Sequence, residues 1–327
     1  MKPKDEFINA LRHNKIKESV PLWELEFHLW DKFNLGKFTI GTEFANLSEK
    51  KKEYALCENS ETIANVCDLL HFSAITIPGS YWETAPGVPA FYWLPDEYRI
   101  KQTLLLKKEI GDTIALVANV GGIMAMPEGN NYMDFSIRLL EAPEEIDRIA
   151  EKLYKESLFR IDLFTDSGAD VLLTASDLAD NHGMYFSPEQ TDRFIFPYLS
   201  KWVDYIKRKG LYSILHTDGN INTALNGIIE CGVDGLQALD PNAKMDILKI
   251  QSNHADKLCV CENIDCGIMI GSSPDVIYIE TERILSSAIE KGSFVFGASN
   301  ALEYDTPVEN YIALVNASEK YGKKEKP

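Results

Sequence analysis

The chain has 327 residues, of which 45% are hydrophobic and 25% charged, and its formal net charge is −17. This composition is typical of a soluble globular protein with a large core, and the negative charge argues against nucleic acid or an anionic membrane as the main partner. No apolar run is long enough to cross a bilayer, and residues 1–6 lack the apolar stretch of a signal peptide. We therefore expect a cytoplasmic protein whose six cysteines are mostly reduced.

The first predicted elements are a helix over residues 4–18 and a strand over residues 20–27. In the strand, Glu24 and Glu26 alternate with apolar side chains, so both carboxylates point to one face. This face is either the acidic wall of a cleft, where it would contact a substrate, or a solvated strand face.

A connection rich in aromatic residues follows a helix predicted over residues 60–70 and a strand predicted over residues 72–78. The connection spans residues 79–98 and includes Tyr81 and Trp82. Because loops rarely bury so much ring area, it is expected to form the wall of an organic ligand site or a docking surface. The alternative is a loop folded back as a small satellite core.

Strands and helices alternate through the rest of the chain, which gives eight strand candidates in all. This count predicts an α/β fold, a (β/α)8 TIM barrel with an N-terminal helical extension, in one domain over residues 1–327. The further predicted strands cover residues 113–119, 171–175, 212–216, 235–239, 258–262 and 294–297. The further predicted helices cover residues 134–141, 143–167, 188–209, 220–231, 244–253, 274–291 and 307–321.

Polar or ionisable residues stand at the ends of seven of the eight predicted strands, whereas the strand interiors are apolar. In a (β/α)8 barrel the active site lies at the C-terminal ends of the strands, so these side chains are expected to gather at one rim. They are Glu24, Glu26, Asn119, Asp177, His216, Asp218, Asp240, Glu262, Ser299 and Asn300.

The stretch over residues 211–221 carries the strongest local signal. It is an apolar, β-compatible run that ends at His216 and Asp218. Two residues apart at a strand end, these side chains project on the same side. They can form an acid/base pair or two ligands of one divalent metal. The alternative is a structural histidine followed by a turn.

The C-terminal half contains a series of short motifs in order along the chain. They are Gly168-Ala169-Asp170 with Asp177, Ser187-Pro188, His216-Thr217-Asp218-Gly219-Asn220, Gly232-Val233-Asp234 through Asp240, Glu262-Asn263-Ile264-Asp265 and Pro307-Val308-Glu309-Asn310. In these motifs the chain resembles the uroporphyrinogen decarboxylase superfamily, most clearly over residues 165–320. This superfamily comprises the haem-pathway decarboxylase and corrinoid-dependent methyltransferases, all of which have a (β/α)8 barrel.

Departures from the family pattern indicate the branch. The decarboxylase holds its tetrapyrrole carboxylates with an arginine-rich N-terminal motif, and this chain has Glu24 and Glu26 there, which would repel a polycarboxylate. The thiol-specific methyltransferases bind zinc through His-x-Cys and a later Cys. Here Asp218 replaces the first thiolate, and Asn300 or Ser299 stands near the second. A histidine with carboxylates is a harder site, suited to polarising oxygen.

The resemblance therefore implies a methyltransferase of the corrinoid-dependent, O-demethylase type. Such an enzyme moves a methyl group from a small donor, such as a methoxylated aromatic compound, to the cob(I)alamin of a partner corrinoid protein. His216 and Asp218 are expected to bind zinc or another divalent metal, or to act as proton donors without one. The third metal ligand would be Glu262, Asp240 or Glu303.

The remaining site residues have expected roles around this pair. Asp177 and Glu262 are catalytic candidates. The expected substrate contacts are Glu24, Glu26, Tyr81, Trp82, Asp177, Gln237, Asp240 and Asn300. The corrinoid protein would dock over the barrel mouth, and the chain itself could form a homodimer. Two alternatives remain open, a decarboxylase-like lyase acting on a small or tetrapyrrole carboxylate and a catalytically silent corrinoid- or substrate-binding barrel.

Overall fold

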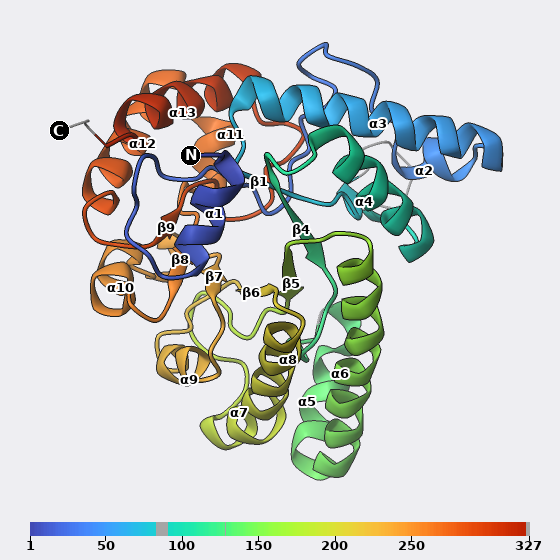
Figure 1. Ribbon diagram of the computed structural model, residues 1–327. Coiled ribbons are helices and arrows are strands. Elements are labelled where there is room, and N and C mark those ends of the chain that lie inside the picture. Colours follow the sequence, from blue (N-terminus) through green and yellow to red (C-terminus); the bar gives the residue numbers. More distant parts are fainter. Residues whose placement is uncertain (83–90, 128, 325–327) are drawn as a thin grey trace.

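The computed structural model describes residues 1–82, 91–127 and 129–324. Its centre is a curled sheet of seven parallel strands, with helices around the outside (Figure 1). The strands follow one another in chain order around the sheet, as the (β/α)8 prediction requires. They are β1 (Ala74–Thr76), β4 (Ala115–Asn119), β5 (Val171–Ala175), β6 (Tyr212–His216), β7 (Gly235–Gln237), β8 (Cys259–Cys261) and β9 (Phe294–Val295).

The segment over residues 20–27, predicted as the first strand, is not a regular strand. It lies between β9 and the start of β1, because Phe296 N–H donates to Pro21 O at 2.9 Å and Ser73 N–H donates to Leu22 O at 2.8 Å. Leu22 also forms a parallel bridge with Phe296. Pro21 has no N–H to donate to a ladder. Irregular extended chain therefore joins the two edge strands of this TIM-barrel-like fold.

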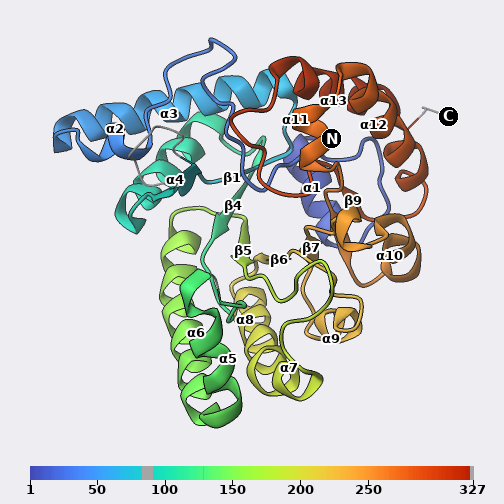
Figure 2. The same cartoon turned by 180° about the vertical axis from the view of Figure 1, so that it is seen from behind.

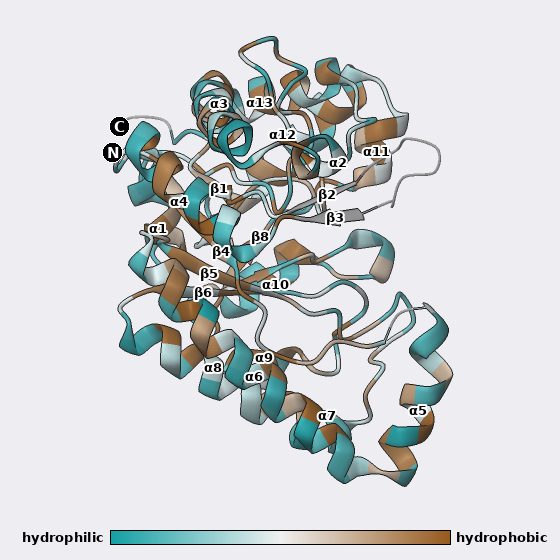
Figure 3. Cartoon of the chain, turned by 90° about the vertical axis from the view of Figure 1, so that its right-hand side faces the viewer, coloured by the Kyte–Doolittle hydropathy of each residue, from teal (hydrophilic) through white to brown (hydrophobic). Residues whose placement is uncertain are grey.

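Helices cover the outer face of the sheet, and their outward surfaces are largely hydrophilic, as α6 and α8 show in Figure 3. The helices of the first half are α1 (Pro3–Leu11), α2 (Gly41–Ala45), α3 (Glu49–Leu70), α4 (Asp96–Ile110), α5 (Tyr132–Glu141) and α6 (Pro143–Asp166). Those of the second half are α7 (Pro188–Phe194), α8 (Phe196–Arg208), α9 (Leu225–Glu230), α10 (Ile247–His254), α11 (Cys266–Gly271), α12 (Pro274–Ala288) and α13 (Val308–Tyr321). In the described part of the chain, no helix has the length and apolar character needed to cross a membrane.

Helix α1 closes one end of the barrel, lying in front of the strands in Figure 1 and behind them in Figure 2. Phe7 and Leu11 are fully buried and pack with the inward-facing residues of the strands. The Phe7 ring packs edge-on against the Trp23 ring, with the ring centroids 5.8 Å apart. The backbone N–H of Lys4 donates to Thr113 O at 2.9 Å, just before β4. Because these contacts lie at the N-terminal ends of the strands, the opposite end remains for the site.

Several predicted boundaries were wrong. The helix predicted over residues 4–18 ends at Leu11, and the one predicted over 60–70 begins at Glu49. The helix predicted over 188–209 is split in two at Ile195. Helix α4 was not predicted, because its buried face includes polar side chains, so the apolar periodicity is weak. Two short antiparallel strands, β2 (Ser80–Trp82) and β3 (Phe91–Trp93), were also not predicted.

Candidate functional site

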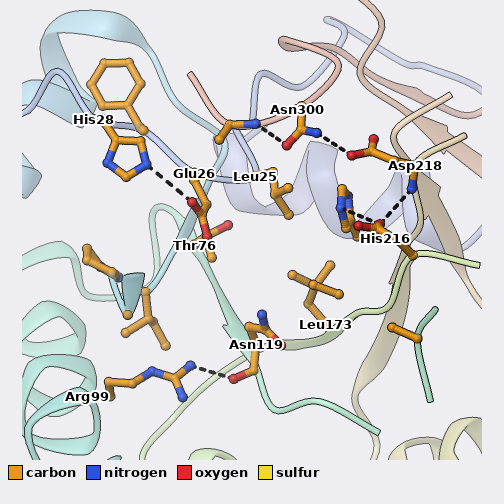
Figure 4. A pocket seen from close by; sticks show the side chains of 18 of the residues that line it. Leu25, Glu26, His28, Thr76, Arg99, Asn119, Leu173, His216, Asp218 and Asn300 are labelled. Atoms are coloured by element: carbon orange, nitrogen blue, oxygen red, sulfur yellow. Dashed lines mark hydrogen bonds and ion pairs between the residues drawn. The ribbon is translucent and has the colours of Figure 1, made fainter. Parts of the chain in front are cut away.

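A cavity of about 380 Å³ opens at the C-terminal ends of the strands (Figure 4). One wall comes from residues 25–28, and the others come from the ends of β1, β4, β5 and β6. The remaining lining residues include Asn300 and Arg99. The position agrees with the predicted rim, because side chains from the ends of four sheet strands face this space.

Asp177, His216 and Asp218 form a compact cluster in this cavity. One ligand atom from each lies within 4.8 Å of the other two, and Nε2 of His216 is 3.4 Å from Oδ1 of Asp177. His216 is the last residue of β6, while Asp177 lies two residues beyond β5. The backbone N–H of Asp218 donates to Asp177 Oδ1 at 3.0 Å, which fixes the two loops together.

Gln237, at the end of β7, fixes the orientation of the His216 ring. Its side-chain oxygen contacts Nδ1 of His216, and its amide nitrogen donates to Glu262 and, at 3.2 Å, to the backbone oxygen of Ser299. An amide oxygen can only accept, so Nδ1 of His216 carries a proton. The other nitrogen, Nε2, therefore faces Asp177 and the cavity and is available for a metal or a second proton.

The charges of the cluster are strongly coupled. Burial lowers the pKa of His216, but the hydrogen bond to Asp177 and the charge of Asp218 outweigh it and raise the pKa to about 9. Burial raises the pKa of Asp218 to about 6, against the opposing effect of His216. Burial also raises the pKa of Asp177, but contact with His216 lowers it further, to a value below the ordinary one. In the absence of a metal, His216 is thus an imidazolium held between carboxylates.

Asn300 holds the carboxylate of Asp218 in place. Its side-chain N–H donates to Asp218 Oδ2 at 2.5 Å, and its side-chain oxygen accepts the N–H of Ala301 at 2.6 Å. Figure 4 shows this chain of contacts ending at the cluster. Of the residues expected near the missing thiolates, Asp218 and Asn300 therefore meet at the site, whereas Ser299 is not among the described residues of the cavity lining.

Glu262 and Glu24 lie beneath the cavity instead of in its lining. Glu262 is fully buried and contacts Gln237, which separates it from His216, so Asp177 and not Glu262 is the third member of the cluster. Glu24 is 3% exposed and accepts hydrogen bonds from Ala298 N and the Tyr311 hydroxyl, both at 2.9 Å. Burial raises the pKa of Glu24 to about 8, and burial with the charge of Glu24 raises that of Glu262.

The other predicted contacts have different outcomes. Glu26 lines the cavity, and its carboxylate is 3.3 Å from Nε2 of His28. Asp240 caps a short 3₁₀ turn by accepting the N–H of Asn242 at 2.8 Å, outside the cavity lining. Glu303 is exposed and is not part of the cluster.

Tyr81 and Trp82 belong to β2, but their side chains lie outside the described part of the structure, as does the loop over residues 83–90. The predicted stacking on a substrate stays a prediction. Sequence reasoning missed Arg99, which lines the cavity from α4. A signal was present in the polar helix start Asp96-Glu97, which follows Pro95.

The donor set fits a divalent cation. One imidazole nitrogen and two carboxylates converge, the remaining ring nitrogen is tied to Gln237, and the cavity leaves space for a substrate ligand. Nitrogen with oxygen donors suits zinc or a harder divalent ion better than a thiolate-selective one.

The uroporphyrinogen decarboxylase (URO-D) family profile matches residues 97–321, so the chain belongs to this family. Among curated proteins, it is 21% identical over 223 residues to the uroporphyrinogen decarboxylase of Anaeromyxobacter dehalogenans, covering 66% of this chain and 62% of that protein. It is 22% identical over 229 residues to the Geotalea daltonii enzyme, covering 67% and 63% respectively. The chain thus spans less than two thirds of the length of these relatives.

A solved methyltransferase from Methanosarcina mazei has a similar fold. The TM-score is 0.74 at 16% sequence identity, and the alignment covers 98% of this chain and 99% of that protein. At this identity the likeness concerns the fold, which agrees with the resemblance inferred from the sequence.

Proposed function

We propose that this protein is a methyltransferase that transfers a methyl group from a small donor to the cob(I)alamin of a separate corrinoid protein. The observation that carries the proposal is the cluster of Asp177, His216 and Asp218 in the cavity at the C-terminal end of the barrel. The likeness in fold to a methyltransferase over nearly the whole chain supports it.

Asp177, His216 and Asp218 would hold a divalent metal, with zinc as the first candidate. When bound, the metal would polarise the oxygen that leaves as the methyl group is transferred. Gln237 keeps Nε2 of His216 directed at the cluster, and Asn300 keeps Asp218 in place. Leu25 and Leu173 contribute apolar surface to the same cavity.

The same residues could also assist the reaction without a metal, by donating a proton. An imidazolium at His216 carries a proton on Nε2, beside Asp177, and could deliver it to a leaving oxygen. Metal binding and proton donation exclude each other at this nitrogen, because a metal-bound imidazole is neutral. Metal content therefore separates the two modes.

The cavity favours a small donor over a polycarboxylate. Its volume of about 380 Å³ is in the range of ordinary small-molecule sites. Glu26, Asp177 and Asp218 contribute carboxylates to its lining. A methoxylated aromatic compound is one such donor. The corrinoid protein would approach the open end of the barrel, since the other end is covered by α1.

A second candidate is a decarboxylase-like lyase, which family membership favours. In that case His216 would act as the acid that protonates the carbanion left after loss of carbon dioxide. The acidic lining restricts such a reaction to a substrate with few carboxylates.

The test combines metal analysis with methyl transfer. The purified protein should bind about one equivalent of zinc, and a panel of methoxylated donors should methylate free cob(I)alamin, followed by its absorbance. Asp177→Asn, His216→Ala and Asp218→Ala should each abolish transfer. As a control, Asp180→Asn should retain it, because Asp180 binds the N–H groups of His182 and Gly183 outside the cavity.

Each outcome discriminates. Absence of methyl transfer from every donor would exclude the proposal, and transfer that persists in all three variants would exclude the cluster as the site of the reaction. Release of carbon dioxide from a small carboxylate, lost in His216→Ala and without methyl transfer, would establish the lyase instead.

A further inference from the structure

Arg99 is an exception in a cavity wall dominated by carboxylates. It is 4% exposed and lines the cavity from α4, whereas the acids Glu26, Asp177 and Asp218 line other parts of the wall. Figure 4 places Arg99 across the cavity from His216 and Asp218. A cation and an acidic cluster at opposite ends of one cavity give a bound molecule a preferred direction.

The guanidinium group of Arg99 is held in a fixed position. Its Nη1 is 3.1 Å from Asp96 Oδ1, and its Nη2 donates to the backbone oxygen of Asn119 at 2.5 Å. Its Cζ lies over the Phe164 ring, 4.7 Å from the ring centroid. Gly79 allows it to lie against the backbone, because a Cβ at that position would be 2.7 Å from Nε. Such a fixed, planar donor group is suited to a planar oxyanion.

A second cavity, of about 500 Å³, adjoins this group and shares Arg99, Asn119 and Ala175 with the first. Arg160, on α6, lines it as well, and its Nε is 3.1 Å from Asp96 Oδ2. The carboxylate of Asp96 is therefore shared by two guanidinium groups.

We infer that Arg99 and Arg160 form an anion-binding subsite, and that the substrate carries one carboxylate or phosphate group that binds there. The inference rests on the proposed function in placing the reacting end of the same molecule at Asp177, His216 and Asp218. The two arginines would hold an anionic group at their end of the cavity, so a substrate with one such group is oriented with its methyl group toward the cluster. This arrangement accommodates one anionic group, not the several of a tetrapyrrole.

The test compares three probes that differ only at the anionic group: 4-methoxybenzoate, 4-methoxyphenyl phosphate and the neutral 4-methoxybenzamide. Binding is measured by titration calorimetry, which requires no turnover. The wild-type protein should bind at least one of the two anions at least tenfold more tightly than the amide, a ratio typical of one charge-assisted contact. The better of the two identifies the group as carboxylate or phosphate.

Variants locate the preference. Arg99→Met should remove the preference for the anions over the amide, and Arg99→Lys should restore part of that preference. Arg160→Gln should reduce the preference while leaving the contact of Arg99 with Asn119 intact. Arg193→Gln is the matched control, since Arg193 pairs with Asp147 outside both cavities. Where methyl transfer is measurable, Arg99→Lys should raise KM for the anionic donor with little change in kcat.

Equal affinity of the wild-type protein for the amide and both anions would overturn the inference. An anion preference that is undiminished in both Arg160→Gln and Arg99→Lys would also overturn the inference. These two variants keep the test possible if Arg99→Met does not fold. An anion preference without methyl transfer would count against the proposed function alone. Transfer from the amide as readily as from the anions would count against the subsite alone.

Discussion

The side-chain oxygen of Gln237 contacts Nδ1 of His216, and this contact determines which nitrogen of the imidazole faces the cavity. The same amide donates to Glu262 and to Ser299 O, so all its polar groups are used. Gln237 thereby links the buried carboxyl group of Glu262 to the acidic cluster. A residue of this kind controls a metal site without touching the metal.

Replacing Gln237 by Leu should weaken zinc binding by roughly 10- to 100-fold, because the ring of His216 loses the partner that orients it. The affinity can be measured by competition with a chelator. Gln251→Leu is the control, since Gln251 is also fully buried and bonds to Ala288 O away from the site. Equal zinc affinity in both variants would show that the contact has no orienting role.

The double variant Asp218→Cys, Asn300→Cys should convert the cluster into a thiolate site. The two side chains already meet, at 2.5 Å between Asn300 Nδ2 and Asp218 Oδ2, so both sulfur atoms would lie beside His216. Thiolates favour zinc over harder ions. Zinc affinity relative to manganese should therefore rise, as measured by competition between the two metals. An unchanged ratio would mean that these positions do not supply metal ligands.

Stability should depend on pH through Glu24. The pKa of Glu24 is about 8 in the folded protein, against an ordinary value of 4.5, so the folded state binds more protons between these values. The free energy of unfolding should then fall as pH rises from 4.5 to 8, by up to about 1.4 kcal/mol per pH unit from this group.

Glu24→Gln should flatten this pH dependence. A glutamine can still accept from Ala298 N and donate to the Tyr311 hydroxyl, so the packing is retained. Urea unfolding at several pH values measures the slope in both proteins. Identical slopes would show that Glu24 has an ordinary pKa in the folded state.

Uroporphyrinogen should be neither bound nor decarboxylated by this protein. Its carboxylates would meet Glu26, Asp177 and Asp218 in the cavity lining, where Arg99 is the one arginine or lysine among the described lining residues. Carbon dioxide release is the measurement, with an authentic uroporphyrinogen decarboxylase as the positive control. Turnover comparable to that control would require a different account of the site.

The sequence predicted the sheet and the central pair of the cluster because both depend on local patterns. Seven apolar runs became the parallel strands, and the His216 and Asp218 spacing placed both side chains at one strand end. The sequence could not show that Asp177, and not Glu262, is the third member of the cluster, because both residues follow predicted strands. The difference arises from Gln237, which lies between Glu262 and His216. Arg99 escaped notice because the inward face of α4 is polar.

The cover that α1 forms over the N-terminal end of the barrel has a kinetic consequence. Among the described residues, Phe7 and Leu11 fill that end, so a methyl donor would enter the cavity at the strands' C-terminal end, where the proposed corrinoid protein would also bind. Two reactants that approach from the same end would have to bind in a fixed order. The methyl donor would have to arrive before the corrinoid protein, and the demethylated product would remain trapped until that protein dissociates.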